Sequence, residues 1–167
     1  MRREAAGDAT AIDRVHELAF GGRVEPDLVR ALRADPGWIP GLALVAEDCD
    51  GIGDGIVGHV VCTRGHVVET EAVGLGPIGV LPDRQRQGIG TALMHAVIAA
   101  ADALDEPLVA LVGEPGYYAR FGFVTASTVG ITAPDPTWGD YFQVRTLTAY
   151  RPDIAGVFTY AQPFNDL

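Results

Sequence analysis

A short glycine-containing segment in the middle of the chain has the composition of an anion-binding turn. Residues 78–91 read Ile-Gly-Val-Leu-Pro-Asp-Arg-Gln-Arg-Gln-Gly-Ile-Gly-Thr, which predicts a strand, a brief loop and the start of a long helix. The first amides of a helix have no partners within it and lie at the positive end of its dipole. Glycine at positions 88 and 90 removes side chains that would keep a phosphate at a distance. The segment therefore predicts a cradle for an anion such as pyrophosphate.

Two other interpretations of the same glycines remain open at this point. A dinucleotide-binding turn needs the pattern G-x-G-x-x-G directly after the first strand, with an acidic residue about 20 positions later. This chain has only G-x-G, in mid-sequence and after two strands with hairpin-turn residues between them, which fits that fold poorly. In the simplest interpretation, Gly88 and Gly90 only let the helix pack closely on the preceding strand.

The helix that would carry this cradle is the most regular pattern in the sequence. From Gly88 to Leu104 apolar residues recur every three or four positions, which is typical of a helix packed on a sheet. Other helices are expected over residues 8–20, 26–34 and 117–120. Strands are expected over residues 2–5, 42–47, 56–63, 67–80, 108–112, 142–147 and 157–160, with a turn into a further strand over 121–124.

Turn chemistry and glycine content distinguish two of these strand regions. Asp50-Gly51 and Asp54-Gly55, between the second and third strands, favour a hairpin. The strand over 67–80 contains an unusual number of disruptive residues, namely Gly74, Gly76, Pro77 and Gly79. Proline offers no ladder donor and glycine marks a bulge or a close backbone approach. A ligand lying along this strand would explain them.

The composition excludes several classes of chemistry. The 167 residues include no lysine and a single serine, Ser127. Without lysine there is no Walker A loop and no pyridoxal-phosphate attachment, and Ser127 lacks the glycines of a nucleophile elbow. The 12 basic and 22 acidic residues give a net charge of −10, which argues against a nucleic-acid partner and is compatible with a cationic substrate.

Length and cysteine content predict the organisation of the protein. A chain of this size buries a sizeable core, so we expect one domain over residues 1–167. Cys49 and Cys62 do not make a disulfide framework, and no segment reads as a secretory leader or a membrane span. We therefore expect a soluble, cytoplasmic protein with no membrane partner.

Two motifs of this sequence resemble those of a known family. Residues 85–90, Gln-Arg-Gln-Gly-Ile-Gly, resemble the Q/R-x-x-G-x-G/A acetyl-coenzyme A motif of the GNAT N-acetyltransferase superfamily. Residues 118–123, Tyr-Ala-Arg-Phe-Gly-Phe, resemble the Y-x-x-x-G-F segment of that superfamily, at the expected distance. The resemblance extends over the whole chain and is closest to the YhbS-like branch of small bacterial acetyltransferases.

This resemblance implies a fold and a cofactor site. The fold would be the α/β (α+β type) GNAT acyltransferase fold, a twisted mixed sheet of about six or seven strands with about four helices. The strand ending at Val80 and the strand over 108–112 would splay apart to admit pantetheine. Backbone groups of Ile78, Gly79 and Val80 would bind the acetyl and pantetheine amides. The pyrophosphate would be held by Arg86, Gln87, Gly88, Ile89, Gly90 and Thr91.

The implied activity is acetyl transfer from acetyl-CoA, the co-substrate, to a primary amine of a small molecule or peptide in one ternary complex. Tyr118 is the candidate acid and the amide of Val80 the candidate oxyanion donor. Glu47, Glu69, Glu71 and Glu114 are candidate acceptors for the proton of the amine, although each also fits a solvated face. Glu114 is the best placed of them, because it follows the second splayed strand. The alternative is a coenzyme A-binding sensor or scaffold domain without turnover.

The chain departs from the family pattern at two positions. Leu111 stands where many members have an asparagine, so contacts from that asparagine are absent. Arg86 replaces a residue that is often small, and it fits either a phosphate contact or a solvated position, as does Arg120. The apolar C-terminal strand fits an edge that pairs in a homodimer as well as one that is covered.

Other groups of residues fit less specific roles. His59, Cys62 and His66, with Cys49, have metal-ligand chemistry, but positions 59 and 62 of a strand face opposite sides, so we expect no metal. His16 and His95 lie within helices, where packing or solvation is the usual role. Four aromatic residues fit either an acceptor pocket or core and lid packing. They are Trp38, Trp138, Tyr141 and Phe142.

Overall fold

The computed structural model of the chain describes residues 1–48 and 55–166. Its α-helices are α1 (Ala9–Phe20), α2 (Val24–Ala34), α3 (Ile89–Ala103) and α4 (Pro115–Tyr118). Its strands are β1 (Arg2–Arg3), β2 (Trp38–Glu47), β3 (Ile56–Val67), β4 (Thr70–Val80), β5 (Leu108–Val112), β6 (Val124–Thr125), β7 (Ile131–Thr132), β8 (Phe142–Thr146) and β9 (Gly156–Thr159). Short 3-10 turns are η1 (Ala6–Asp8), η2 (Pro82–Arg84), η3 (Ala119–Phe121), η4 (Ala126–Val129), η5 (Pro136–Tyr141) and η6 (Gln162–Asp166).

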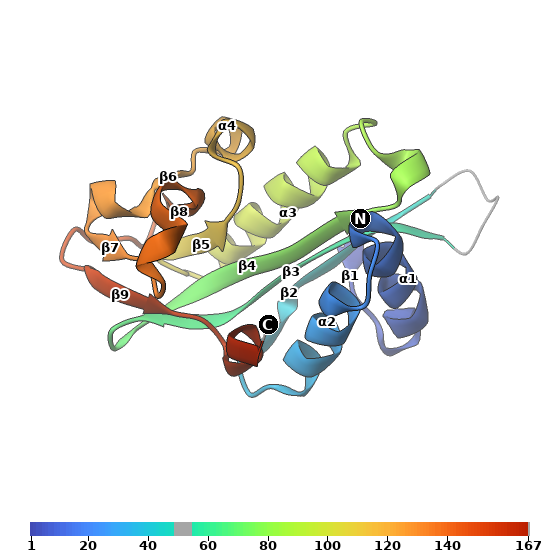
Figure 1. The fold of residues 1–167 in the computed structure, drawn as a ribbon, viewed down its shortest axis with the longest axis horizontal. Helices are drawn as coiled ribbons and strands as arrows, with labels where there is room; N and C mark the ends of the chain where they lie inside the picture. The colour runs from blue at the N-terminus through green and yellow to red at the C-terminus, as the bar shows by residue number, and fades with distance from the viewer. Residues whose placement is uncertain (49–54, 167) are drawn as a thin grey trace.

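One mixed sheet runs through the molecule and has β4 and β5 at its centre (Figure 1). The order along the sheet is β1-β2-β3-β4-β5-β8-β6, and every neighbouring pair in this order is antiparallel except β4 with β5. β9 pairs with the far end of β3, and β7 pairs with β9. The family fold implied by the sequence, an α+β sheet with flanking helices, is therefore present.

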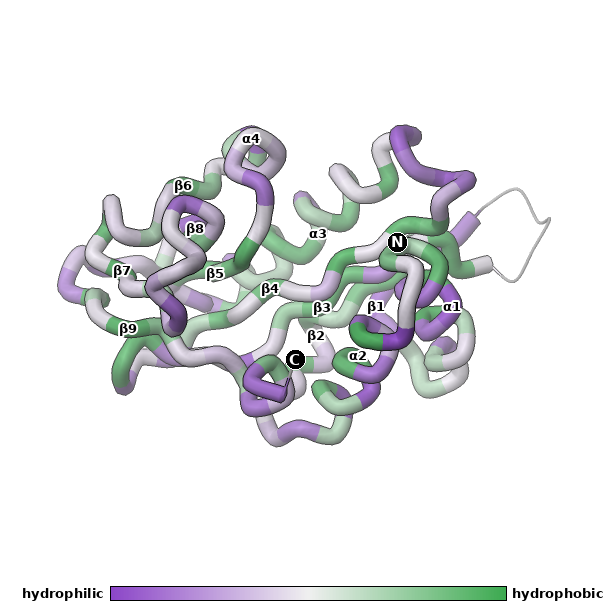
Figure 2. Tube along the Cα trace, viewed as in Figure 1, coloured by the Kyte–Doolittle hydropathy of each residue, from purple (hydrophilic) through white to green (hydrophobic). Residues whose placement is uncertain are grey.

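The helices cover opposite faces of this sheet because the side chains of its strands alternate. Leu44 and Val60 belong to the core beneath α3, whereas Val45 packs with α1 and α2 on the other face. α3 buries one face on the sheet, formed by Leu93, Met94, Val97, Ile98 and Ala101, and Figure 2 shows this helix beside the central strands. Ala92, Ala103 and Leu104, which belong to the apolar pattern predicted from the sequence, are exposed. Within the described residues, no helix has both the length and the apolar character that crossing a bilayer requires.

The structure confirms most of the expected elements and adjusts their ends. The helix expected from Gly88 begins one residue later, because Gly88 is its N-cap in a left-handed conformation with φ of 84°. The strand expected from residue 67 begins at Thr70, after a turn in which Val68 has φ of 55°. Over the residues that the structure describes, the sheet has nine strands rather than six or seven, since two-residue strands such as β7 leave no readable pattern. The hairpin turn expected at Asp50-Gly51 lies outside the described residues.

Two of the glycines of β4 lie against side chains from other segments. A Cβ at Gly74 would lie 2.5 Å from the ring of Tyr160, which comes from the C-terminal segment. A Cβ at Gly79 would lie 2.9 Å from Nδ1 of His16 on α1. Packed side chains therefore account for glycine at both positions, and contact of this strand with a ligand stays a prediction.

Candidate active site

The two central strands part at the start of the candidate site. β4 and β5 run parallel, but their residues are paired only at Val73 with Val109 and at Gly74 with Ala110. Beyond these pairs β4 continues beside β3 as far as Val80, while β5 stays paired with β8 along its length. Each strand keeps its outer partner, so the two separate, as the family resemblance implied.

The backbone of β4 presents alternate residues to this opening. The amide of Leu81 donates to the carbonyl of Val57 on β3, at 2.9 Å. Because successive residues of a strand point their backbone groups in opposite directions, Gly79 also faces β3, and Ile78 and Val80 face the opening. The side-chain amide of Gln85 donates to the carbonyl of Val80 at 3.1 Å, so this side chain closes over the end of β4.

The loop after β4 exposes the N-terminus of α3. The first helical bond runs from the amide of Ala92 to the carbonyl of Gly88, at 2.9 Å, so the amides before it have no partner within the helix. A side chain at Gly88 would be strained by its left-handed backbone. A Cβ at Gly90 would lie 3.4 Å from the hydroxyl of Tyr117, on the opposite wall. Glycine at position 90 therefore keeps the space in front of the helix open.

These elements enclose a groove of about 690 Å³ between α3 and α4, which we call the cofactor groove. Its walls carry two guanidinium groups, those of Arg86 and Arg120, near the exposed amides of α3. A positive helix terminus with two cations suits a phosphorylated ligand. The lining residues are Ile78, Val80, Gln85, Arg86, Gly88, Gly90, Thr91, Gly113, Glu114, Tyr117, Tyr118 and Arg120.

Tyr118 lines the cofactor groove beside Gly113. Its ring packs over Gly113, where a Cβ would approach a ring carbon to 2.2 Å, so only glycine admits the tyrosine in this position. The ring also contacts Tyr117 and Phe123 edge-on, with centroids 4.9 and 5.8 Å apart. Burial, together with the neighbouring Tyr117, raises the pKa of Tyr118 to about 12. The phenol is therefore neutral, and a hydrogen-bond donor, throughout the physiological pH range.

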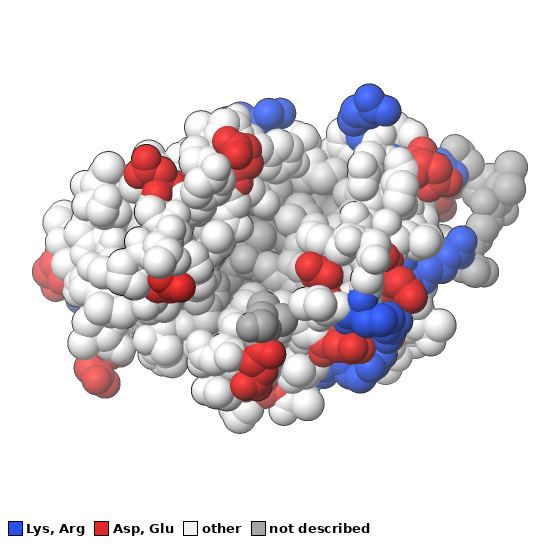
Figure 3. Space-filling model, viewed as in Figure 1, with Lys and Arg blue, Asp and Glu red and all other residues white. Residues whose placement is uncertain are grey.

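A second cavity of about 610 Å³ meets the first at Tyr118 and Ile78, which line both. It lies between the C-terminal end of α1, the start of α2, η5 and η6. Figure 3 shows that this face of the molecule is hollowed between the half with α1 and α2 and the half with β8 and β9. Two separate ligands could therefore meet at Tyr118, one from each cavity.

Comparison with known proteins decides the family. The sequence profile described as "Acetyltransferase (GNAT) domain" matches residues 40–125, more than half of the chain. The chain belongs to the GNAT acetyltransferase family. Over 164 residues it is 30% identical to the uncharacterized N-acetyltransferase YjhQ of Escherichia coli, covering 93% of this chain and 88% of YjhQ. It is 29% identical to the uncharacterized N-acetyltransferase YhbS of E. coli, covering 99% and 98% of the two chains.

Two solved GNAT structures are similar to this one along nearly the whole chain. E. coli YhbS in complex with CoA superposes with a TM-score of 0.87 at 28% identity, covering 98% of this chain and 90% of that one. A GNAT acetyltransferase of Brucella melitensis in complex with acetyl-CoA gives a TM-score of 0.77 at 32% identity, covering 98% and 96%. The resemblance to YhbS-like acetyltransferases inferred from the two motifs is confirmed.

The predicted cofactor-binding residues of this GNAT domain divide into two sets. Those that line the groove are Ile78, Val80, Arg86, Gly88, Gly90 and Thr91. The other three face elsewhere. Gly79 lies against His16, Gln87 donates its side-chain amide to the carbonyl of Asp83 at 3.0 Å, and Ile89 packs on the core beneath α3. Contact of any of these residues with a cofactor stays a prediction.

The candidate carboxylates are dispersed over the molecule. Glu114 is exposed at the N-cap of α4, accepts from the amide of Gly116 at 3.5 Å, and lines the cofactor groove. Glu47 pairs with Arg2 at 2.9 Å, and neither Glu69 nor Glu71 lines either cavity. Of the four, only Glu114 therefore lies at the site.

Sequence reasoning missed several residues that line the two cavities. Gln85 is the first residue of the matched cofactor motif, and that position could have identified it. Glu25 and Asp135 line the second cavity. In the sequence each looks like an ordinary surface carboxylate, so no local pattern marks it as part of a site. Of the four aromatic residues considered for an acceptor pocket, Trp138 lines this cavity. The other three do not: Phe142 is core, Tyr141 is exposed and Trp38 packs beside α2.

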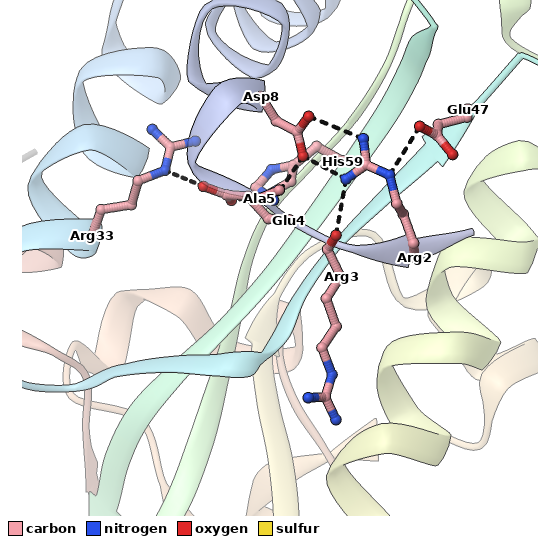
Figure 4. A network of polar contacts seen from close by, with 8 residues as sticks. All are labelled: Arg2, Arg3, Glu4, Ala5, Asp8, Arg33, Glu47 and His59. Carbon is pink, nitrogen blue, oxygen red and sulfur yellow. Dashed lines mark hydrogen bonds and ion pairs between the residues drawn. The ribbon is translucent and has the colours of Figure 1, made fainter.

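A buried polar chain runs from Glu4 through His59 to His16, which lies against β4 at Gly79. Figure 4 shows the part of this chain formed by Glu4, Arg33 and His59. His59 Nε2 lies 3.1 Å from the carboxylate of Glu4, which also pairs with Arg33, and His59 Nδ1 lies 2.8 Å from His16 Nε2. Burial lowers the pKa of His16 to about 3 and lowers that of His59, so both rings are neutral near pH 7. Because Glu4 accepts the Nε2 proton of His59, His59 Nδ1 accepts from His16, and His16 Nδ1 is left as an acceptor beside Gly79.

The residues considered for a metal have other surroundings. His59 is held in the chain just described, and burial raises the pKa of the Cys62 thiol, which disfavours the thiolate that a metal requires. Among the described residues, no three His, Cys, Asp or Glu side chains are grouped so that they could hold an ion. Cys49 lies outside the described residues.

Proposed function

We propose that this protein transfers the acetyl group of acetyl-CoA to a primary amine in a ternary complex. The observation that carries the proposal is that the cofactor groove and the second cavity meet at Tyr118 and Ile78. Support comes also from the similar YhbS and Brucella structures, which hold CoA and acetyl-CoA respectively. A groove lined by a helix N-terminus and by a tyrosine suits a ligand that carries phosphates and a reactive thioester.

The residues of the groove would divide the work between binding and chemistry. The amides at the start of α3, with Arg86, would hold the pyrophosphate. The backbone of Ile78 would orient the pantetheine, and the amide of Val80 would donate to the carbonyl oxygen as negative charge develops there. Gly79, whose own backbone faces β3, would contribute by letting His16 pack close beneath. Glu114 lines the cofactor groove but not the second cavity, so it would receive the proton of the amine from within the cofactor groove.

The reaction requires one bond to form and one to break. The neutral amine attacks the thioester carbon, the carbon–sulfur bond breaks, and the amine loses a proton while the sulfur gains one. With a pKa of about 12, Tyr118 is a weaker acid than a thiol of pKa about 8.5, so full proton transfer to the thiolate would cost roughly 5 kcal/mol. We therefore assign to Tyr118 a hydrogen bond to the departing sulfur, while water supplies the final proton.

Turnover by the Tyr118→Phe variant tests this proposal. A hydrogen bond to a charged group contributes about 1.5–3 kcal/mol, so we expect kcat to fall by about 10- to 150-fold. Thiol release from acetyl-CoA, measured with a panel of amines, gives kcat, and calorimetry checks that acetyl-CoA binding is retained. Tyr141→Phe is the matched control, since Tyr141 is exposed and lines neither cavity. Because the chain has no lysine, acetylation of its own lysines contributes no background.

Two results would contradict the proposal. Unchanged turnover in Tyr118→Phe would remove the tyrosine from the mechanism. Binding of acetyl-CoA without acetylation of any amine would favour a coenzyme A-binding sensor instead. The cytoplasmic location expected from the sequence stays a prediction, and the sequence leaves a homodimer as one of two alternatives for the C-terminal strand.

A further inference from the structure

The wall of the second cavity is largely apolar and combines aromatic rings with aliphatic side chains. Phe20 of α1, Trp138 of η5 and Phe164 of η6 surround it, together with Tyr118 and Tyr160. The ring of Tyr160 lies 4.9 Å from that of Phe164 and 6.2 Å from that of Trp138, so these three form one cluster. The cavity therefore presents ring faces and edges to its contents, which favours an apolar or aromatic body.

Tyr160 adds a ring but no hydroxyl to this surface. Its hydroxyl is buried, has no hydrogen-bond partner among the described residues, and has a pKa raised by that burial and by Cys62. Because the hydroxyl oxygen is buried while Tyr160 as a whole is partly exposed, the ring rather than the hydroxyl reaches the cavity. A polar body such as an aminosugar would thus find few hydrogen-bond partners on this wall.

The charges on the cavity wall have one sign. Glu25, in the first turn of α2, and Asp135, at the N-cap of η5, are its only charged lining residues within the described chain. Asp135 accepts from the amide and the hydroxyl of Thr137, at 2.8 and 2.7 Å, and these bonds lower its pKa, which keeps it ionised. No arginine or histidine lines the cavity, and the sequence has no lysine. The wall thus complements an ammonium group and offers no cation to a carboxylate.

Building on the proposed function, we propose that the acceptor is a primary amine carried on an aromatic or similarly apolar body without a carboxylate. Its ammonium group enters past Glu25 and Asp135, and its apolar body packs against the cluster of Trp138, Tyr160 and Phe164. The amine then meets the thioester at Tyr118, where the two cavities join. An amino acid is excluded by its carboxylate, and a polyamine lacks the apolar body that these walls desolvate.

Three probes separate these classes of acceptor. 2-Phenylethylamine has the proposed features, phenylalanine adds one carboxylate to the same skeleton, and spermidine replaces the ring with further ammonium groups. We expect kcat/KM for 2-phenylethylamine to exceed that for phenylalanine by about 100-fold or more, because a carboxylate would be buried without a partner. Equal or higher kcat/KM for phenylalanine or spermidine would overturn the inference and leave the proposed acetyltransferase activity standing.

Variants of the wall test the same inference from the protein side. Glu25→Gln and Asp135→Asn keep the shape of the cavity, and asparagine still accepts from Thr137. Each should raise KM for 2-phenylethylamine by about fivefold or more and leave KM for acetyl-CoA unchanged. Glu17→Gln is the matched control, since Glu17 is an exposed carboxylate of α1 outside both cavities. Unchanged KM in both wall variants would overturn the assignment of these carboxylates.

A failure of catalysis would still be distinguishable from a failure of this inference. If no amine is acetylated, 2-phenylethylamine is titrated by calorimetry into the protein saturated with coenzyme A. Binding that weakens in Glu25→Gln and Asp135→Asn would support the acceptor class, although the acetyltransferase proposal had failed. Absence of binding by the wild type would overturn the inference itself.

Discussion

Acidification should destabilise this fold through the buried histidine chain beneath β4. Burial lowers the pKa of His16 to about 3 in the folded protein, whereas its ordinary value is 6.5. Between these values the unfolded state binds a proton that the folded state does not. The contribution of His16 to stability is therefore complete above pH 6.5 and is lost as the pH falls toward 3. From pH 7 to pH 4 the expected loss from His16 is roughly 3 kcal/mol.

The His16→Gln variant isolates this contribution. Its side-chain amide can donate to His59 Nδ1 as the imidazole does, but it does not titrate. Urea unfolding at pH 7, 6, 5 and 4, followed by the fluorescence of Trp38 and Trp138, gives the free energy of unfolding. We expect the wild type to lose roughly 3 kcal/mol more than His16→Gln between pH 7 and pH 4. His95→Gln, which changes an exposed histidine of α3, should lose as much as the wild type.

The same pH dependence in wild type and His16→Gln would refute the reasoning. It would mean that His16 is protonated as readily in the folded protein as in the unfolded chain. The assignment of neutral imidazoles, with His59 donating to Glu4 and His16 donating to His59, would then be wrong.

Two further changes probe the cofactor groove. Gly113→Ala places a Cβ within 2.2 Å of the ring of Tyr118, so the ring must move. Stability to urea should fall by roughly 1–3 kcal/mol, and turnover should fall at least as far as in Tyr118→Phe. Full turnover in a folded Gly113→Ala protein would contradict the position assigned to the tyrosine. Arg86→Gln removes one cation from the groove and should weaken acetyl-CoA binding by about tenfold. Calorimetry at low and high salt should show that the affinity for acetyl-CoA depends less on salt in this variant than in the wild type. An equal salt dependence of the two affinities would place Arg86 in solvent.

The parts of the site that could be predicted from the sequence are those formed by residues that follow one another in the chain. The start of α3 and the glycine at its N-cap could be predicted, because exposed amides and a left-handed backbone are properties of a few consecutive residues. Tyr118 was found through a motif that also lies within one short segment. Its role in contacting a cofactor or substrate stays a prediction.

The parts that could not be predicted depend on contacts between distant segments. The glycine at position 74 accommodates a ring from the C-terminal segment, and the glycine at 79 accommodates a histidine of α1. In the sequence, such positions look the same as glycines that admit a ligand. Glu25 and Asp135 become neighbours of one cavity only because α2 and η5, which are far apart in the sequence, line the same cavity. Neither carboxylate has a sequence environment that distinguishes it from an ordinary surface residue.

A calorimetric titration of acetyl-CoA into the wild type, Gly88→Glu and Gly21→Glu tests most directly whether the N-terminus of α3 holds the cofactor. Gly88 and Gly21 are well matched, since both have left-handed backbones, with φ of 84° and 75°, and a Cβ at either would meet no atom within 4 Å. Only Gly88 lines the cofactor groove. We expect micromolar binding by the wild type and by Gly21→Glu, and a loss of about 100-fold or more in Gly88→Glu, where a carboxylate would face the phosphates. No binding by the folded wild type, or equal binding by Gly88→Glu, would contradict the account.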